Sequence, residues 1–405
     1  MKPVRYLYPI LIAATLTASC SAGQKKSAEE TPWKYALMAG ETLDSIYAHY
    51  GVEGENLLRE NYPNDEFYRA TYLAGDDNNS PKPFSYLWPY SSTVSAVRAI
   101  YDATGDSAYL TLLQEKVAPG LEEYLDTARM PAAYASYISR APQSDRFYDD
   151  NIWLGIDFTD FYLGTKDPAH LDKARMIWEF IESGTDDKLG GGIYWCEQKK
   201  GGKNTCSNAP GSVYALKLFK ATGDSAYLAA GSGLYDWTKT NLQDTTDYLY
   251  FDHKLMNGKI GRAKFAYNSG QMMQAATLLY DITGDKRCLT DAQNIAEIAH
   301  RYFFSRTATD SIGEFPLIKN GDIWFTAVMM RGFYELFLAD GNPAYMDNYL
   351  RNLDYAWEHA RDTETGLFNS DWSGDTKDER KGLITQGAMA EMFATAALYQ
   401  SKQNK

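Results

Sequence analysis

Two adjacent aspartates, Asp149 and Asp150, are the residues in this chain best suited to chemistry, and they lie in the aromatic run FYDDNIW. Neighbouring Cα atoms are about 3.8 Å apart. Two loop carboxylates can therefore reach the roughly 5 Å separation between the nucleophile and the acid/base of a retaining glycosidase. Because the surrounding rings make a carboxylate costly to ionise, one member of the pair can stay protonated near neutral pH, as acid–base catalysis requires.

Adjacent acidic residues also occur in ordinary structure. Asp76-Asp77 opens a polar loop sequence, and Asp186-Asp187 precedes a glycine-rich turn. On adjacency alone, a helix N-cap and its neighbour would explain such a pair. Only Asp149-Asp150 has bulky aromatic residues on both sides, and this context favours catalysis over capping.

The elements that hold this pair are expected to be helical hairpins, because one segment repeats along the chain. The sequence YDATGDSAYL of residues 101–110 recurs with few changes at 219–228 and 280–289, and looser copies begin at Phe161 and Phe337. The copies are spaced by 57 to 61 residues, and a constant period indicates a repeating unit. In each copy a glycine can end one helix in the left-handed conformation, and the Asp or Asn that follows it can cap the next helix.

A period of about sixty residues accommodates two helices and two connections. Extending the count to both ends of the chain gives six hairpins and predicts an all-α fold, an (α/α)6 barrel with one helix of each pair inside and one outside. An open array of tetratricopeptide type has a period of about 34 residues, which does not fit. Short strand hairpins are expected in the loops at one end, at 190–195 and 248–251.

The N-terminus has the layout of an export signal. Residues 1–19 carry two basic residues and then an apolar stretch too short to span a bilayer. We interpret them as a lipoprotein signal peptide, with Cys20 as the lipidated residue, 20–31 as a flexible tether and 32–405 as the catalytic domain. The alternative is an ordinary secretory signal that contains a chance cysteine.

Composition excludes several classes of partner. The formal net charge is −13, which argues against binding to nucleic-acid phosphates, and no basic helix suggests binding to anionic lipids. Cys196, Cys206 and Cys288 leave at least one thiol unpaired, and a Cys196–Cys206 bridge stays open. The five histidines lack zinc-ligand spacing, so we expect no metal.

The remaining conspicuous residues suit a neutral sugar, whose ring faces stack on aromatic side chains while its hydroxyl groups bond to polar ones. For any single aromatic residue, core or surface packing is the competing explanation. For Asn208 and Asn268 the competing explanation is helix capping. The candidate sugar-binding residues are Tyr148, Trp153, Tyr194, Trp195, Asn204, Asn208, Tyr267, Asn268, Trp324 and Gln386.

Taken in order, these motifs resemble family 76 of the glycoside hydrolases. The resemblance rests on Asp149-Asp150, the GGIYW run ending at Trp195, the stretch 203–208 and Tyr267-Asn268. It covers nearly the whole mature chain. It implies an (α/α)6 barrel and a retaining hydrolase, chiefly endo-acting, that cleaves the α-1,6-mannosidic linkages of fungal-type mannan. It further implies Asp149 as nucleophile and Asp150 as acid/base, with no cofactor.

Two other functions remain as alternatives. A sugar epimerase on the same barrel would use a histidine base, and none of the histidines lies in a motif-bearing loop. A non-catalytic glycan-binding lipoprotein would not need the intact aspartate pair. We expect a monomer whose partner is α-1,6-mannan or manno-oligosaccharides. We also expect it to be lipid-anchored in a bacterial envelope, facing the periplasm rather than the cell surface, because no acidic cluster follows Cys20.

Overall fold

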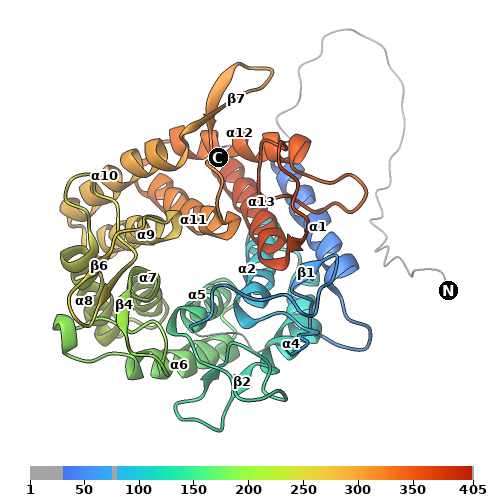
Figure 1. Ribbon diagram of the computed structural model, residues 1–405. Coiled ribbons are helices and arrows are strands. Elements are labelled where there is room, and N and C mark those ends of the chain that lie inside the picture. The colour runs from blue at the N-terminus through green and yellow to red at the C-terminus, as the bar shows by residue number, and fades with distance from the viewer. Residues whose placement is uncertain (1–30, 75–79, 404–405) are drawn as a thin grey trace, which may run out of the picture.

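The computed structural model describes residues 31–74 and 80–403, which form a closed ring of helices with one layer inside the other (Figure 1). The inner layer consists of α2 (Leu87–Thr104), α5 (Tyr148–Thr165), α7 (Thr205–Thr222), α9 (Ala266–Thr283), α11 (Ile323–Asp340) and α13 (Leu383–Gln403). The outer layer consists of α1 (Thr31–Tyr50), α3 (Ser107–Leu112) continued by a π-helical turn and α4 (Ala118–Glu122), α6 (Pro168–Ser183), α8 (Ser225–Leu242), α10 (Lys286–Phe303) and α12 (Ala344–His359). The predicted all-α (α/α)6 barrel is confirmed.

The repeated turns join each inner helix to the outer helix that follows it. Gly105 ends α2 in the left-handed conformation with φ 66°, and Asp106 caps α3 by accepting a hydrogen bond from the backbone N–H of Ala108 at 2.9 Å. The other glycine-ended copies repeat this geometry. The second copy differs from our expectation, because Gly164 lies inside α5 and Lys166 takes the left-handed conformation with φ 59°.

The ring closes through the first and last helices. The Tyr50 hydroxyl at the end of α1 donates to the carbonyl of Lys381, just before α13, at 2.8 Å. Beside it, β1 (Asn61–Tyr62) pairs antiparallel with β9 (Lys381–Gly382). Five pairs are therefore consecutive in sequence, whereas the sixth joins elements from opposite ends of the chain.

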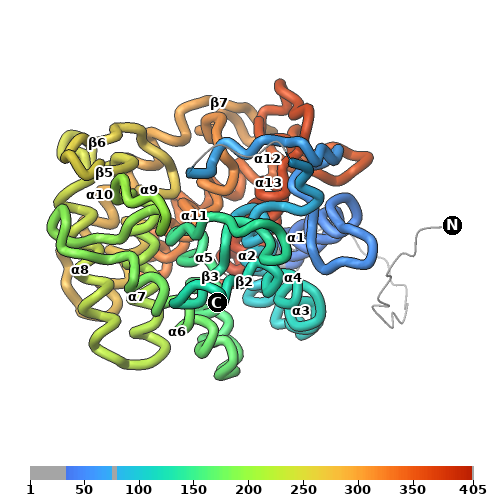
Figure 2. Tube along the Cα trace, turned by 60° about the horizontal axis from the view of Figure 1, so that its bottom comes forward, coloured from blue at the N-terminus to red at the C-terminus, as the bar shows by residue number. Residues whose placement is uncertain are grey.

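Short strands gather on one side of the ring, where Figure 2 shows β5, β6 and β7 along its upper edge. The pairs are β2 (Leu125–Asp126) with β3 (Ala133–Tyr134), β7 (Arg306–Thr309) with β8 (Glu314–Leu317), and the set β4 (Gly202–Asn204), β5 (His253–Leu255) and β6 (Ile260–Gly261). The strands expected at 190–195 and 248–251 are absent from the described chain, and each segment holds only an isolated bridge. Positive φ angles at Gly190, Gly191 and Gly192 prevent an extended strand there.

Several inner helices approach one another closely at small residues. A Cβ atom on Gly270 of α9 would lie 2.4 Å from the Cα of Met329 in α11, so only glycine allows this contact.

Among residues 31–74 and 80–403, every helix is too short or too polar to cross a membrane. The expected signal peptide, Cys20 and nearly all of the expected tether lie outside the described residues, and α1 begins at Thr31.

Candidate active site

All inner helices begin at the same end of the ring, and their first turns surround one cavity. The cavity has a volume of about 590 Å³. The second residue of five inner helices lines it: Trp88, Asp149, Cys206, Tyr267 and Trp324. Because a helix N-terminus carries partial positive charge, this end of the ring suits carboxylates and electron-rich ligands.

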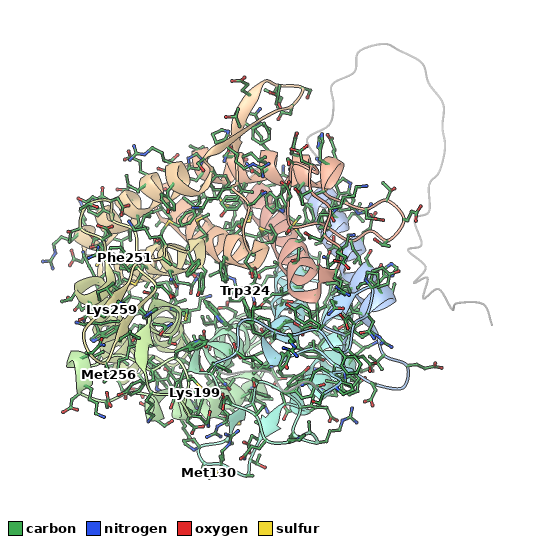
Figure 3. The ribbon with its side chains drawn as sticks, viewed as in Figure 1. Met130, Lys199, Phe251, Met256, Lys259 and Trp324 are labelled. Atoms are coloured by element: carbon green, nitrogen blue, oxygen red, sulfur yellow. The ribbon has the colours of Figure 1, made fainter. Side chains whose placement is uncertain are left out.

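Aromatic rings form much of the cavity wall. Trp324 meets Trp88 and Trp153 edge to face, with ring centroids 5.5 and 4.8 Å apart, and Figure 3 shows Trp324 near the centre of the ring of helices. Tyr267 stacks on Phe325 at 4.1 Å and 11°. A rigid aromatic wall with few polar groups is a typical small-molecule site and matches the apolar faces of a sugar.

Asp149 has the environment of an ionised carboxylate. The Trp195 indole N–H donates to Oδ2 of Asp149 at 3.0 Å, and the backbone N–H of Asp150 donates to Oδ1 at 3.1 Å. Burial raises the pKa of Asp149 to about 6, while hydrogen bonds from Cys206, Trp195 and the backbone oppose that rise. At neutral pH the donors thus favour the charged form.

Asp150 has the opposite environment. Burial and the neighbouring charge of Asp149 raise the pKa of Asp150 well above its usual value. The carboxyl group faces the cavity, where no side chain or backbone group within the described chain hydrogen-bonds to it. The two adjacent carboxyl groups are therefore driven to different protonation states, as acid–base catalysis by a pair of carboxyl groups requires.

The three cysteines in the described chain are free thiols, so the structure contains no Cys196–Cys206 bridge. Cys206 lines the cavity, and its thiol opposes the rise in the pKa of Asp149 that burial causes. Burial raises the pKa of Tyr267 well above its usual value, and Cys206 adds to that rise. Among residues 31–74 and 80–403, no group of three or more His, Cys, Asp or Glu side chains is arranged so that it could hold a metal ion.

The structure brings half of the predicted sugar-binding residues together around the aspartate pair: Trp153, Trp195, Asn204, Tyr267 and Trp324. Trp195 contacts the Phe147 ring at 5.0 Å in addition to bonding Asp149. Its role is thus broader than the sugar stacking that its type alone suggests.

The other half lies away from the cavity. Tyr148 stacks on Phe180 at 4.6 Å, and the Tyr194 hydroxyl donates to Asp186 at 2.7 Å. Asn268 is fully buried, and its side-chain amide has no hydrogen-bond partner in the part of the chain that the structure describes. The remaining two, Asn208 and Gln386, bind loop backbone.

Asn208 and Gln386 each form a pair of hydrogen bonds with loop backbone that recurs around the ring. Asn208 accepts from the N–H of Ile193 at 2.7 Å and donates to its carbonyl at 2.9 Å. Gln386 does the same to Phe368, at 2.7 and 3.0 Å. Asn151 binds both backbone groups of Tyr134. Each is the fourth residue of an inner helix, so these side chains hold loops in place at the cavity end of the ring.

Several cavity residues were missed by sequence reasoning. Trp88 and Cys206 occupy the same helix position as Asp149, and the repeat register is the signal that could have found them. Asp252 and His253 also line the cavity, with Oδ2 of Asp252 2.8 Å from Nδ1 of His253. His253 lies outside the motif-bearing loops in sequence, but pairing of β5 with β4 brings it beside Asn204 and into the cavity wall. Further lining residues are Tyr72, Tyr86, Phe265 and Phe325.

Comparison with known proteins supports a glycosidase site. Residues 61–405 match the family described as glycosyl hydrolase family 76. A family 76 mannosidase structure from Bacteroides thetaiotaomicron VPI-5482 is 30% identical with a TM-score of 0.82, covering 92% of this chain and 100% of that chain. A family 76 structure from a bovine strain of the same species is also 30% identical, with a TM-score of 0.80, and covers 90% of this chain and 78% of that chain.

An α-1,6-mannanase from Salegentibacter sp. HEL1_6 is 25% identical with a TM-score of 0.71, and the match covers 90% of this chain and 99% of that chain. A variant of that enzyme with two consecutive aspartates changed to asparagine is inactive, and its structure contains α-1,6-mannotriose. The extent of the match, and the fold and paired aspartates described above, place this chain in glycosyl hydrolase family 76.

Proposed function

We propose that this protein is a retaining α-1,6-mannanase that cleaves within the mannan chain, with Asp149 as nucleophile and Asp150 as acid/base. The observation that carries the proposal is the contrast between the two carboxyl groups. Asp149 accepts hydrogen bonds that favour its charged form, whereas Asp150 is raised in pKa by burial and by Asp149. Both face one aromatic cavity.

The chemistry would proceed by double displacement. The Asp149 carboxylate attacks the anomeric carbon and forms a glycosyl ester, while Asp150 gives its proton to the departing sugar oxygen. Asp150 then removes a proton from water, which attacks the anomeric carbon and releases the sugar. Two inversions restore the starting configuration, and Asp149 returns to its ionised form.

The cavity supports a sugar substrate rather than a charged one. Its aromatic wall suits the apolar face of a pyranose, and Asn204, Asp252 and His253 offer polar atoms to hydroxyl groups. His253 is paired with Asp252, but family membership favours hydrolysis over epimerisation. A binding protein without catalysis would not need two carboxyl groups of opposite protonation.

The decisive experiment compares Asp149→Ala with Asp150→Ala on α-1,6-mannan and on an aryl α-mannoside. Asp149→Ala should lose turnover on both, because no covalent intermediate can form. Asp150→Ala should release aryl alcohol in a burst and then stall until azide attacks the intermediate, giving the α-mannosyl azide.

Asp187→Ala is the matched control, because Asp187 also belongs to an adjacent aspartate pair but is exposed and outside the cavity. It should keep wild-type kcat/KM. Formation of the β-azide by Asp149→Ala, with Asp150→Ala inert, would reverse the two roles. Near-normal activity of both variants on mannan would refute the proposal.

We further propose that the protein is anchored in the bacterial envelope through a lipid on Cys20, facing the periplasm. The support is the sequence layout, in which two basic residues, an apolar stretch and small residues precede Cys20. The polar residues that follow it would serve as a tether.

A further inference from the structure

The segment that carries Trp195 is paired with the segment that begins α5. Phe147 and Cys196 form an antiparallel bridge. The N–H of Tyr148 donates to the carbonyl of Trp195 at 2.9 Å, and the N–H of Glu197 donates to the carbonyl of Arg146 at 3.0 Å. Trp195 lies one residue before Cys196 and Asp149 lies two residues after Phe147, so the bridge fixes the Trp195 indole relative to Asp149.

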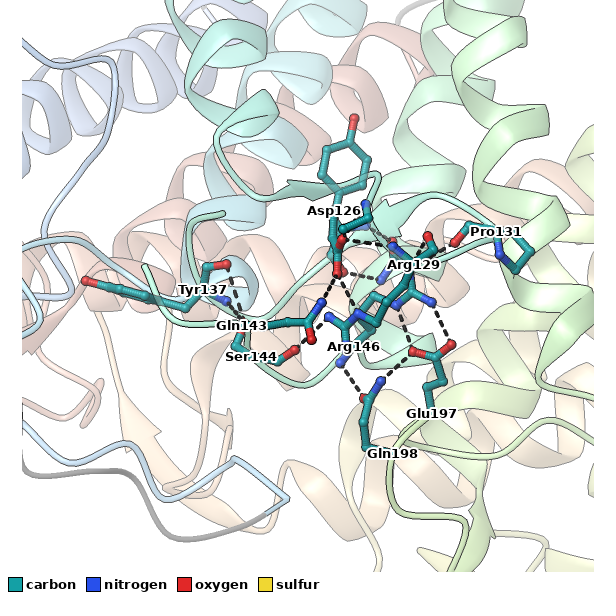
Figure 4. A network of polar contacts seen from close by, with 12 residues as sticks. Asp126, Arg129, Pro131, Tyr137, Gln143, Ser144, Arg146, Glu197 and Gln198 are labelled. Atoms are coloured by element: carbon teal, nitrogen blue, oxygen red, sulfur yellow. Dashed lines mark hydrogen bonds and ion pairs between the residues drawn. The ribbon is translucent and has the colours of Figure 1, made fainter. Parts of the chain in front are cut away.

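A buried arginine fixes the register of the two segments (Figure 4). The Arg146 guanidinium is fully buried and binds both carboxylate oxygens of Glu197, at 2.7 and 2.6 Å. It also donates to the carbonyls of Arg129 and Pro131, at 3.1 and 2.9 Å. Planar, bidentate pairing of this kind confers geometric specificity.

A second side chain reaches Asp149 from another inner helix. Cys206 of α7 is buried and lines the same cavity, and its thiol opposes the rise in the pKa of Asp149 that burial causes. Tyr267 of α9 lines the cavity as well. Groups from the 195–197 segment and from α7 thus act on one carboxylate.

We propose that Trp195 and Cys206 are positioning residues that hold the Asp149 carboxylate in the orientation required for attack. This inference rests on the proposed role of Asp149 as nucleophile. Trp195 donates a hydrogen bond to Asp149 and the Cys206 thiol favours the charged form of Asp149, whereas in the described chain neither side chain acts in this way on Asp150. The donors therefore determine which of the two adjacent carboxyl groups carries the charge, and they also fix the orientation of that group.

The hydrogen bonds also stabilise the ionised carboxylate, so their loss has a specific signature. Removing one donor should move the acid limb of kcat/KM to higher pH, because protonation of Asp149 becomes easier. A residue with a purely structural role would change the rate without moving the limb. The titratable groups that share this cavity with Asp149 are Asp150, Lys199, Cys206, Asp252, His253, Tyr72, Tyr86 and Tyr267.

The test measures kcat/KM against pH for Trp195→Phe, Cys206→Ala and Cys206→Ser on a neutral α-1,6-manno-oligosaccharide. Trp195→Phe keeps an aromatic ring but loses the indole N–H. It should move the acid limb up by about one pH unit. Cys206→Ala should move the limb in the same direction, and Cys206→Ser, which keeps a donor, should restore it.

Two matched controls separate a specific shift of the acid limb from a general loss of structure. Trp237→Phe removes an indole hydrogen bond of the same 3.0 Å length, made to the Leu189 carbonyl outside the cavity. Cys288→Ala removes a half-buried thiol from α10. Neither should move the limb.

Two outcomes would overturn the inference: an unmoved acid limb in both Trp195→Phe and Cys206→Ala, or a limb moved equally by the controls. Asp149→Ala, measured in parallel, distinguishes failure of the positioning role from failure of the proposed function. If it is inactive while the limb stays fixed, only the positioning role fails. If it remains active, the proposed function itself fails.

Discussion

The Arg146 guanidinium and the Glu197 carboxylate form two parallel hydrogen bonds, of 2.7 and 2.6 Å, that join the start of α5 to the segment after Trp195. Burial opposes the charge on Glu197, but the hydrogen bonds and charge of Arg146 still hold its pKa below the usual value. The pair lies outside the cavity wall, so its contribution is to geometry and stability rather than to substrate contact.

Breaking this pair should destabilise the fold. Arg146→Met should lower the free energy of unfolding by about 3 kcal/mol, the low end for a broken buried pair, since the Glu197 side chain is 23% exposed and partly hydrated. Urea unfolding checks this value. Arg287→Met, which breaks a pair whose arginine is 90% exposed, should leave the midpoint unchanged. An equal loss in both variants would contradict the prediction.

The pH dependence of kcat/KM should be bell-shaped. Burial raises the pKa of Asp149 to about 6, and the active form is ionised, so activity should fall as the pH drops through that value. Asp150 must be protonated and its pKa is raised well above its usual value, so activity should also fall at high pH. On an activated aryl mannoside, Asp150→Ala should lose the alkaline limb. Persistence of that limb would assign it to another group.

Gln386 should contribute to the stability of the fold and not to substrate binding. Gln386→Ala leaves the buried N–H and carbonyl of Phe368 without their partner. It should cost about 1–3 kcal/mol of unfolding free energy, with KM unchanged. Gln293→Ala, which removes an exposed contact to Asp340, is the matched control. A rise in KM with stability intact would instead indicate sugar contact.

Trp88 should contribute to substrate binding. It is half-buried, lines the cavity and lies stacked beside Phe325 at 6.1 Å. Trp88→Ala should raise KM about tenfold through lost aromatic contact. Trp33→Ala, at a site 64% exposed on α1, should be neutral. Equal KM values in both variants would remove Trp88 from the sugar site.

Lipid anchoring predicts a change in cell fractionation. Cys20→Ser should move the protein from the membrane fraction to the soluble fraction, because acylation requires the thiol. The activity of the released protein on α-1,6-mannan should equal that of the anchored form. A wild-type protein that is soluble and unacylated would contradict the lipid anchor.

Local signals explain why the fold was predictable. Gly105 and Asp106 specify a helix end and a helix start within two residues, and the same pair recurs around the ring. The second copy shows where this signal fails. It has no glycine at position 166, so the sequence predicted the turn but did not identify Lys166 as its left-handed residue. Ring closure by α1 and α13 depends on contacts between the two ends of the chain, which no repeat contains.

The site was predictable in part for a similar reason. Acidic and aromatic residue types drew attention to Asp149 and Trp324, and both line the cavity. Polar type alone drew attention to Asn208 and Gln386, which instead bind backbone. Residue type does not tell whether a buried amide faces a loop or a ligand; the position within the helix does.

The pairing of α1 with α13 also bears on how the enzyme would meet a polymer. The end of α1 at Tyr50 lies beside the start of α13, at the cavity end of the ring. Thr31, at the other end of α1, therefore belongs to the opposite face. Attachment through residues that precede Thr31 would join the domain on the face opposite the cavity, and it would leave the cavity entrance unobstructed for long polysaccharide chains.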